Sequence, residues 1–296
     1  MKSNFIGIGE VLWDLLPGGR QLGGAPANFA YHAAALGASA RVISRVGNDS
    51  LGKELVERLE KIGLPSDCIQ VGSSAPTGTV TVEVAADGQP KFHIHERVAW
   101  DALADEPAAQ AAVAAADVIC FGSLAQRSEP ARSTIRSLIA RTRSSAWRVF
   151  DINLRQHYYS RSVIEESLAW ANVLKINDEE LPRLADMLGL KGDIRSQIGE
   201  LVRRFGLRLV AFTRGGSGSL LHSDGNWSDQ PGIATNVVDT VGAGDSFTAA
   251  MMLGLLAGWS LDHINEQANR VAAYVCSQTG ATPAIPPSLR DTFRNE

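Results

Sequence analysis

The chain has 296 residues, enough for about two average domains or one large α/β domain. Its 28 lysines and arginines stand against 32 aspartates and glutamates, and the resulting formal net charge of −4 gives no electrostatic reason to expect a nucleic-acid or anionic-membrane partner. Hydrophobic residues make up 45% of the chain and charged residues 20%, a balance that excludes global disorder.

The apolar segments of the chain indicate neither export nor membrane insertion. Glu10 and Asp14 interrupt the first apolar stretch, so we predict no signal peptide. Region 108–124 is broken by Gln110 and Asp117 and predicts a helix followed by a buried strand, not a membrane span. The three cysteines are too widely spaced for a disulfide framework or a zinc cluster: Cys68, Cys120 and Cys276. We therefore expect a cytoplasmic protein.

Short apolar runs alternate with helical patterns over most of the chain. The runs that predict buried strands are 5–9, 40–46, 118–122, 148–152, 173–176 and 208–213. Between them lie amphipathic segments, such as the one in which Leu51, Leu55 and Leu59 share a helical face. Two helices in succession, 244–258 and 261–278, end the pattern. Such alternation predicts an α/β fold with a mostly parallel sheet and helices on both faces.

One insertion departs from this alternation. Segments 77–85 and 91–98 alternate polar and apolar residues around Asp87-Gly88, which predicts a β-hairpin with a type I′ turn. Segment 11–24, with its own Pro17-Gly18-Gly19 turn, is expected to supply further strands. We therefore predict a small β lid, made of 11–24 and 77–98, that projects from a single domain spanning 1–296.

The sharpest motif is a glycine-rich turn that opens an apolar helix at 239–252. Gly242, Ala243 and Gly244 precede Asp245 there. The N–H groups of such a turn and the dipole of the helix form an anion site. A carboxylate beside a bound phosphate is poorly explained as a phosphate ligand, because like charges repel, but it suits a general base that takes a proton from an attacking hydroxyl. The alternative is that Asp245 only complements the helix dipole.

A second glycine motif lies near the N-terminus. Gly23 and Gly24 precede a predicted helix that carries Pro26 and Asn28. A glycine pair lets a ligand approach the backbone, and Asn28 in the first turns is placed to hydrogen-bond a ligand hydroxyl. The alternative is a plain turn followed by a helix start with Pro26 near its first position.

Together the two motifs resemble the signatures of the PfkB family, the ribokinase-like carbohydrate kinases. The second signature is matched without a break over 239–252, and the resemblance extends over nearly the whole chain. Segments 9–14 and 150–155 look most like those of bacterial fructokinases and 2-keto-3-deoxygluconate kinases. The first signature is matched by Gly23, Gly24, Pro26, Asn28, Ala30, Gly37 and Gly47. The resemblance implies a ribokinase-like doubly wound sheet with a β lid, and MgATP-dependent phosphorylation of a sugar hydroxyl.

The resemblance also implies roles for single residues. Asp245 falls on the catalytic base of the family, and Gly242, Ala243 and Gly244 fall on its anion hole. The residues expected to bind the sugar are Asp14, Gly24, Asn28, Arg97 and Arg155.

Nucleotide-binding residues are expected in three places. The spacing of Asn177 and Glu180 matches a family pattern that acts near the phosphates and a magnesium-bound water, although it is equally that of an ordinary capping box. Thr213 and Gly215 lie in a glycine-rich segment that resembles the nucleotide-binding loop, the alternative being a β-turn. Asn269 matches a position near the adenine, the alternative being a surface amide on a helix.

Some relatives also bind potassium, mostly through backbone oxygens. The corresponding positions are Asp239, Val241, Val275, Gln278 and Gly280. A last ligand there can be a serine hydroxyl, but Ala284 occupies that place. We therefore expect Mg²⁺ with ATP and leave potassium open.

Two further patterns are set aside. Residues 47–53 have the spacing of a phosphate-binding Walker loop, but Glu54 replaces the hydroxyl that must ligate magnesium. His93 and His95 share one face of the predicted hairpin, but no third ligand completes a metal site.

The resemblance of segments 9–14 and 150–155 favours fructose, phosphorylated on a primary hydroxyl. Asp14 and Asn28 suit a neutral polyol, whereas Arg97 and Arg155 match the carboxylate of 2-keto-3-deoxygluconate. Arg155 either meets such a carboxylate, or orients phosphate, or pairs with an acid such as Asp151. Further alternatives are a kinase for ribose or a nucleoside, and a catalytically silent protein that binds sugar and nucleotide. The strand edges of the lid predict a homodimer.

Overall fold

Two β-sheets organise the molecule. The computed structural model describes residues 2–16, 18–84 and 90–293. Within these residues the larger sheet has nine strands: in spatial order β13 (Asn226–Gln230), β12 (Ser219–Ser223), β11 (Leu209–Thr213), β10 (Val173–Asn177), β9 (Trp147–Asp151), β8 (Val118–Phe121), β1 (Asn4–Ile8), β4 (Ser39–Gly47) and β5 (Ile69–Gly72). Neighbouring strands from β5 to β11 are parallel, and β12 and β13 form an antiparallel edge.

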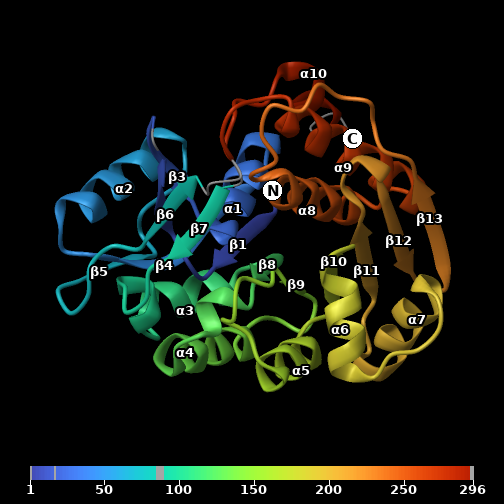
Figure 1. Ribbon diagram of the computed structural model, residues 1–296, viewed down its shortest axis with the longest axis horizontal. Coiled ribbons are helices and arrows are strands. Elements are labelled where there is room, and N and C mark those ends of the chain that lie inside the picture. Colours follow the sequence, from blue (N-terminus) through green and yellow to red (C-terminus); the bar gives the residue numbers. More distant parts are fainter. Residues whose placement is uncertain (1, 17, 85–89, 294–296) are drawn as a thin grey trace.

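Helices cover both faces of this sheet (Figure 1). One face packs against α3 (Pro107–Ala114), α4 (Glu129–Ala140), α5 (Arg161–Trp170), α6 (Glu180–Leu188) and α7 (Ile194–Phe205). The other face packs against α1 (Ala25–Leu36), α2 (Ser50–Lys61), α8 (Ala243–Leu256) and α9 (Leu261–Cys276), with the short α10 (Pro287–Arg290) beyond them. This is the doubly wound arrangement predicted from the strand–helix alternation.

Strand β10 illustrates why these runs are nearly all apolar. Leu174 and Ile176 enter the core under α3 to α7, whereas Val173 points to the opposite core. Because successive side chains alternate between faces and both faces are covered, a central parallel strand needs apolar residues at almost every position. The next side chain that faces the α8 side is Lys175, a charged exception.

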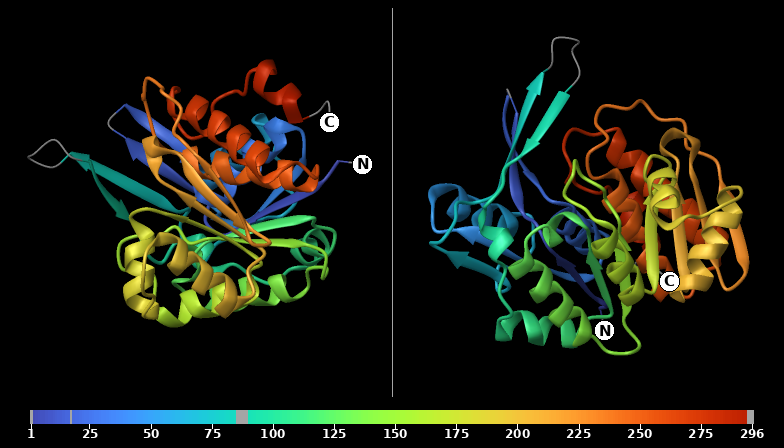
Figure 2. Two further views of the ribbon diagram at one scale, coloured as in Figure 1. Left: turned by 90° about the vertical axis from the view of Figure 1, so that its right-hand side faces the viewer. Right: turned by 60° about the horizontal axis from the view of Figure 1, so that its bottom comes forward.

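A separate four-stranded sheet lies beside the first. Its strands, in spatial order, are β3 (Gly19–Gly23), β2 (Leu12–Leu16), β6 (Thr79–Val84) and β7 (Pro90–Ile94). Figure 2 shows the β6–β7 hairpin projecting away from the layered body. The strands fall within the segments predicted for the lid, but the turn expected at Asp87-Gly88 lies outside the described residues.

A buried arginine fastens the base of this small sheet. The Nε and Nη2 atoms of Arg127 donate to the Asp101 carboxylate at 2.8 and 2.9 Å, and Nη2 also donates to the carbonyl of His95, 2.6 Å away. The guanidinium stacks over the rings of Trp100 and Tyr158, at 3.9 and 4.7 Å from their centroids. The chain that leaves β7 is therefore anchored to the larger body by one charged group.

The predicted strands of the larger sheet are confirmed with ends shifted by one or two residues, as are the two final helices. Strand β5 and the β12–β13 hairpin were not predicted. The hairpin turn contains Asp224 and Gly225 at φ 49° and 78°, the left-handed pair that a type I′ turn requires. This Asp-Gly pair was the available signal for the missed hairpin.

The order of the strands places a binding site. The chain runs outward from β1 through β4 to β5, then returns to β8 on the other side of β1 and runs outward again to β11. Open α/β sheets bind ligands outside the carboxyl ends of their strands where the winding reverses in this way. That point lies between β1 and β8, and the segments after β1, β9, β10 and β11 open onto the same edge. Among the described residues, no helix has the length and apolarity to cross a membrane.

Candidate active site

Asp245 and Asn28 meet outside this edge of the larger sheet, although 217 positions separate them. Asp245 lies in the first turn of α8, and its Oδ2 accepts a hydrogen bond of 2.9 Å from Nδ2 of Asn28 in α1. The Oδ1 of Asn28 is buried and has no partner in the described part of the chain. The fold thus brings the two glycine motifs together through this hydrogen bond.

The turn before Asp245 is held in a conformation that favours glycine. Gly242 has φ 80°, and a Cβ there would lie 2.5 Å from the carbonyl oxygen of Ala281. The turn places the N–H groups of Gly244 and Asp245 at the start of α8, where a helix provides no internal acceptor. These groups are therefore available to an anion.

The surroundings of Asp245 favour its protonated form. Burial and the nearby Asp151 carboxylate raise the pKa of Asp245 to about 6, against the hydrogen bond from Asn28 and the charges of Lys175 and Arg155. A base with this pKa is mostly ionised at pH 7 and can still accept a proton.

Asp14 and Gly24, two of the residues expected to contact sugar, belong to neighbouring segments, since Asp14 lies in β2 and Gly24 directly follows its partner strand β3. Burial raises the pKa of Asp14, at the middle of β2, to about 6, while Arg155 opposes the shift. A Cβ on Gly23 would overlap the Asp14 carboxylate, and one on Gly24, at φ 110°, would overlap the carbonyl of Glu10. Gly24 is therefore required by its backbone conformation and by the neighbouring backbone, whereas a larger residue at position 23 would displace the Asp14 side chain.

Glu10, two residues beyond the end of β1, was not predicted as a site residue. Its side chain is buried and its Oε2 has no hydrogen-bond partner among the described residues. Burial raises the pKa of Glu10 to about 7, with a further increase from Asp245 and an opposing effect of Arg155. A carboxyl group within an otherwise apolar strand end was the signal available in the sequence.

Arg97 and Arg155 are exposed and form no ion pair with a described residue. Arg97 has φ 54°, and Asn153 and Gln156, on either side of Arg155, have φ 41° and 48°. Such conformations are costly outside glycine and concentrate at functional sites. The charge of Arg155 acts on Glu10, Asp14 and Asp245 together, whereas the suggested pairing with Asp151 is wrong, because that carboxylate pairs with Lys175.

The Asp151–Lys175 pair lies beneath the turn and was missed. Lys175 Nζ lies 3.2 Å from Asp151 Oδ1, and both side chains are more than nine-tenths buried. Burial alone would lower the pKa of Lys175, but Asp151, together with Glu180 and Asp245, raises it above the usual value. A lysine inside an apolar strand was the signal in the sequence.

Asn177 and Glu180 form the reciprocal hydrogen bonds of a capping box. The Glu180 N–H donates to Asn177 Oδ1 at 2.9 Å, and the Asn177 N–H donates to Glu180 Oε2 at 3.0 Å. Glu180 Oε1 also accepts from the N–H of Leu154. Each oxygen of the Glu180 carboxylate accepts one of these bonds and retains a second lone pair, so Glu180 can cap the helix and still accept a hydrogen bond from a water molecule.

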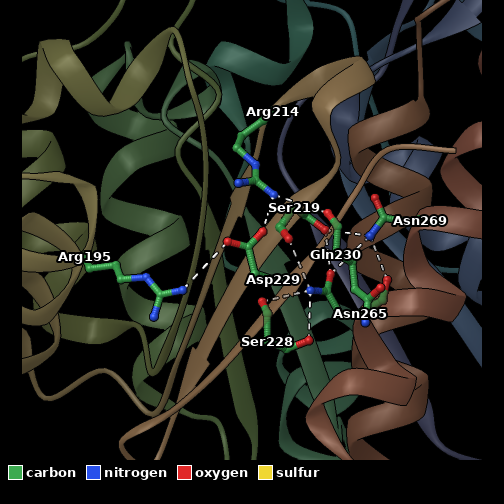
Figure 3. A network of polar contacts seen from close by, with 8 residues as sticks. All are labelled: Arg195, Arg214, Ser219, Ser228, Asp229, Gln230, Asn265 and Asn269. Atoms are coloured by element: carbon green, nitrogen blue, oxygen red, sulfur yellow. Dashed lines mark hydrogen bonds and ion pairs between the residues drawn. The ribbon is translucent and has the colours of Figure 1, made fainter.

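The expected nucleotide residues lie at the neighbouring strand ends. Thr213, at the end of β11, is the partner of Asn177 in the parallel register, and Gly215 begins the following 3-10 turn. Asn269 in α9 donates from Nδ2 to Ser219 Oγ at 2.7 Å and to the carbonyl of Asn265 at 2.8 Å (Figure 3). This network fastens α9 to the β12–β13 edge and leaves the Asn269 oxygen for a ligand.

The five positions expected to bind potassium come from two segments that hydrogen bonds hold together. The Asp239 carboxylate accepts from the N–H groups of Val241 and Gly280, each at 3.0 Å. The Gln278 N–H donates to the carbonyl of Val275. The carbonyl of Ala284 accepts from the hydroxyl of Tyr274. The atoms expected to bind the ion at these positions are oxygens, the ligands that a hard cation prefers.

The histidine pair on β7 forms contacts within the small sheet. The rings of His93 and His95 lie edge to face at 4.9 Å, and His95 Nε2 lies 2.7 Å from the hydroxyl of Thr81. Within the described ranges, no three His, Cys, Asp or Glu residues form a group that could hold a metal.

Comparison with known proteins agrees with this geometry. Residues 18–287 match the family model described as pfkB family carbohydrate kinase. A fructokinase from Klebsiella pneumoniae is 31% identical over 303 residues, which cover 97% of each chain. The uncharacterized sugar kinase PH1459 from Pyrococcus horikoshii, whose crystal structure is a complex with ATP, has a TM-score of 0.81 at 30% identity and 94% coverage of each chain.

The fold itself is the ribokinase-like α/β fold. The structure of a fructokinase from Xylella fastidiosa with bound ATP has a TM-score of 0.86 at 24% identity, covering 100% of this chain and 99% of that one. The chain therefore belongs to the pfkB family of carbohydrate kinases and is a phosphotransferase with an alcohol group as acceptor.

Proposed function

We propose that the protein transfers the γ-phosphoryl group of MgATP to a primary hydroxyl of fructose. The observation that carries this proposal is the hydrogen bond between Asn28 and Asp245, together with the charge of Arg155 that acts on both Asp245 and Asp14. Amide and carboxylate groups recognise the hydroxyls of a neutral polyol. The 31% identity with a fructokinase over nearly the whole chain supports fructose as the acceptor.

In this proposal Asp245 is the general base. Asn28 holds one carboxylate oxygen, so the other is free to accept the proton of the sugar hydroxyl. The hydroxyl oxygen forms a bond to the γ-phosphorus while the bond to the β–γ bridging oxygen breaks, and that electron pair leaves with ADP. The N–H groups of Gly244 and Asp245 bind the transferring phosphoryl oxygens at the start of α8.

A magnesium ion bound with ATP would neutralise charge on the phosphates. Glu180, Asn177 and Thr213 line the neighbouring strand ends where the triphosphate would lie, with Glu180 holding a water of the ion. Asp239, Val241, Val275, Gln278 and Gly280 would hold potassium through oxygen donors behind the turn.

The small sheet acts as a lid on one domain. Arg97 leaves this sheet in a left-handed conformation, from which it would reach the sugar on closure. Exclusion of water prevents hydrolysis of ATP in place of transfer. The outer strands β3 and β7 present unpaired edges, which a second copy of the chain would cover in a homodimer.

One observation favours a second acceptor, 2-keto-3-deoxygluconate. Arg97 and Arg155 leave two guanidinium groups without an ion-pair partner among the described residues, and a guanidinium binds a carboxylate in bidentate fashion. The test is kcat/KM for fructose and for the acid sugar in the wild type and in Arg155→Ala, with Arg161→Ala as a control. Arg161 is an exposed arginine that pairs with Glu165 on α5.

We expect fructose to be preferred and Arg155→Ala to slow both sugars alike, because a cation near the site assists the transferring phosphate. A wild-type preference for the acid sugar that Arg155→Ala abolishes selectively would replace fructose by 2-keto-3-deoxygluconate. Activity on ribose or a nucleoside above that on fructose would also refute the proposed substrate.

A further inference from the structure

Lys175 occupies a position where the fold calls for an apolar residue. It lies in β10 between Leu174 and Ile176, and its side chain points to the face covered by α8. Its ammonium group is buried and has Asp151 as its ion-pair partner. Replacing a buried ion pair by well-packed apolar residues is often neutral or stabilising, so stability does not account for this pair.

The ammonium group lies directly behind the anion-binding turn. A Cβ built on Gly244 would lie 2.9 Å from Lys175 Nζ. Gly244 is thus the residue that allows a cation to approach the start of α8. The positive end of the ion pair faces the turn, since it is the Lys175 ammonium group that lies close to Gly244. The negative partner, Asp151, lies on the neighbouring strand β9.

The surrounding charges explain why a cation is needed there. Asp151, Glu180 and Asp245 all act electrostatically on Lys175, which is the buried cation they share. A triphosphate that approaches the turn would meet three carboxylates in a poorly hydrated site, where like charges repel strongly. The helix dipole and the backbone N–H groups supply only partial positive charge against them.

We propose that Lys175 is an electrostatic residue of the phosphoryl-transfer step, its ammonium group stabilising the negative charge that gathers at Gly244, while Asp151 only compensates its buried charge. The inference rests on the proposed phosphoryl transfer at the same site. It assigns a function to a residue outside both glycine motifs. It also relates the absence of a side chain at position 244 to the ammonium group of a residue on another element.

The test compares Lys175→Met/Asp151→Asn with Asp151→Asn. The double variant removes both charges of the ion pair, so neither partner is left as an unpaired buried ion and its melting temperature should stay close to that of the wild type. Turnover of the double variant should fall about 100-fold or more, while KM for sugar and ATP changes little. The single variant keeps the ammonium group and should keep most of the turnover.

Aluminium fluoride supplies a second readout, because with MgADP and fructose it mimics the transferring phosphoryl group. We expect the wild type and Asp151→Asn to form the slowly dissociating inhibited complex, and the double variant to bind MgADP and fructose without capturing the fluoride. Capture or wild-type turnover in the double variant would overturn the proposal, as would loss of capture in Asp151→Asn. A wild type that captures fluoride only with another sugar would refute fructose, and capture by the double variant with that sugar would overturn the role of Lys175.

Discussion

Replacement of Asp245 by asparagine should have opposite effects on two quantities: it should lower kcat and raise the free energy of unfolding. The pKa of Asp245 is raised from 3.8 to about 6, so the folded protein binds the proton more tightly than the unfolded chain does. The increase in pKa corresponds to a loss of about 3 kcal/mol in the free energy of unfolding when the carboxyl group is ionised. We expect roughly half of this loss, because the side chain is partly exposed. The loss of stability accumulates as pH rises from about 4 to about 6 and is constant above that range.

We therefore expect Asp245→Asn to lower kcat by about 10²-fold or more while making the protein more stable at pH 8 by roughly 1 to 2 kcal/mol. The advantage should be smaller at pH 4.5, where the wild-type carboxyl is largely protonated. Urea unfolding at the two pH values measures the stability, and steady-state kinetics with MgATP measures kcat.

Asp262 provides a matched control, because it is an exposed acid in the first turn of α9. Asp262→Asn removes the same favourable interaction with a helix dipole, so it should lower stability by about 0.3 to 1 kcal/mol and leave kcat unchanged. Wild-type turnover in Asp245→Asn would remove this residue from the mechanism. A stability advantage that does not grow with pH would refute the electrostatic reasoning.

Three further changes test other parts of the structure. Gly244→Ala would place a Cβ 2.9 Å from the ammonium nitrogen of Lys175, so turnover should fall about 10²-fold. The control is Gly199→Ala, whose Cβ would have no atom within 4 Å and which should leave turnover unchanged in the same kinetic assay. Arg127→Met leaves Asp101 buried and unpaired, so the free energy of unfolding measured in urea should fall by about 3 to 5 kcal/mol. A loss below about 1 kcal/mol would contradict the anchoring role of Arg127. Hydrogen exchange in 12–23 and 79–94 should slow when fructose binds, and unchanged exchange would count against lid closure.

The larger sheet could be predicted because parallel strands covered on both faces need nearly continuous apolar runs. Segment 173–176 was predicted as a buried strand although it contains a lysine. Because the apolar pattern alone decided that prediction, no functional role was inferred for Lys175. The β12–β13 hairpin escaped because polar residues interrupt its apolar pattern, above all in β13, the outermost strand, one side of which tolerates polar residues.

The site could be predicted only as far as its local motifs extend. Each glycine motif indicates a turn and a helix start, but the hydrogen bond between Asn28 and Asp245 depends on how α1 and α8 pack. The burial of Glu10 and the ion pair of Asp151 with Lys175 likewise arise from strands that are distant in sequence. Local spacing carries no information about such contacts, and a resemblance supplies roles without distances.

The distance along the chain between the two halves of the site has a consequence for biosynthesis. Helix α1 and the lid strands emerge from the ribosome long before α8, so an incomplete chain can build the first strands of the sheet without any catalytic capacity. Contacts of such high sequence separation form late, because a long loop must close before they contribute. Until α8 arrives, the apolar surface of α1 lacks one of its main covers and is a natural target for chaperones.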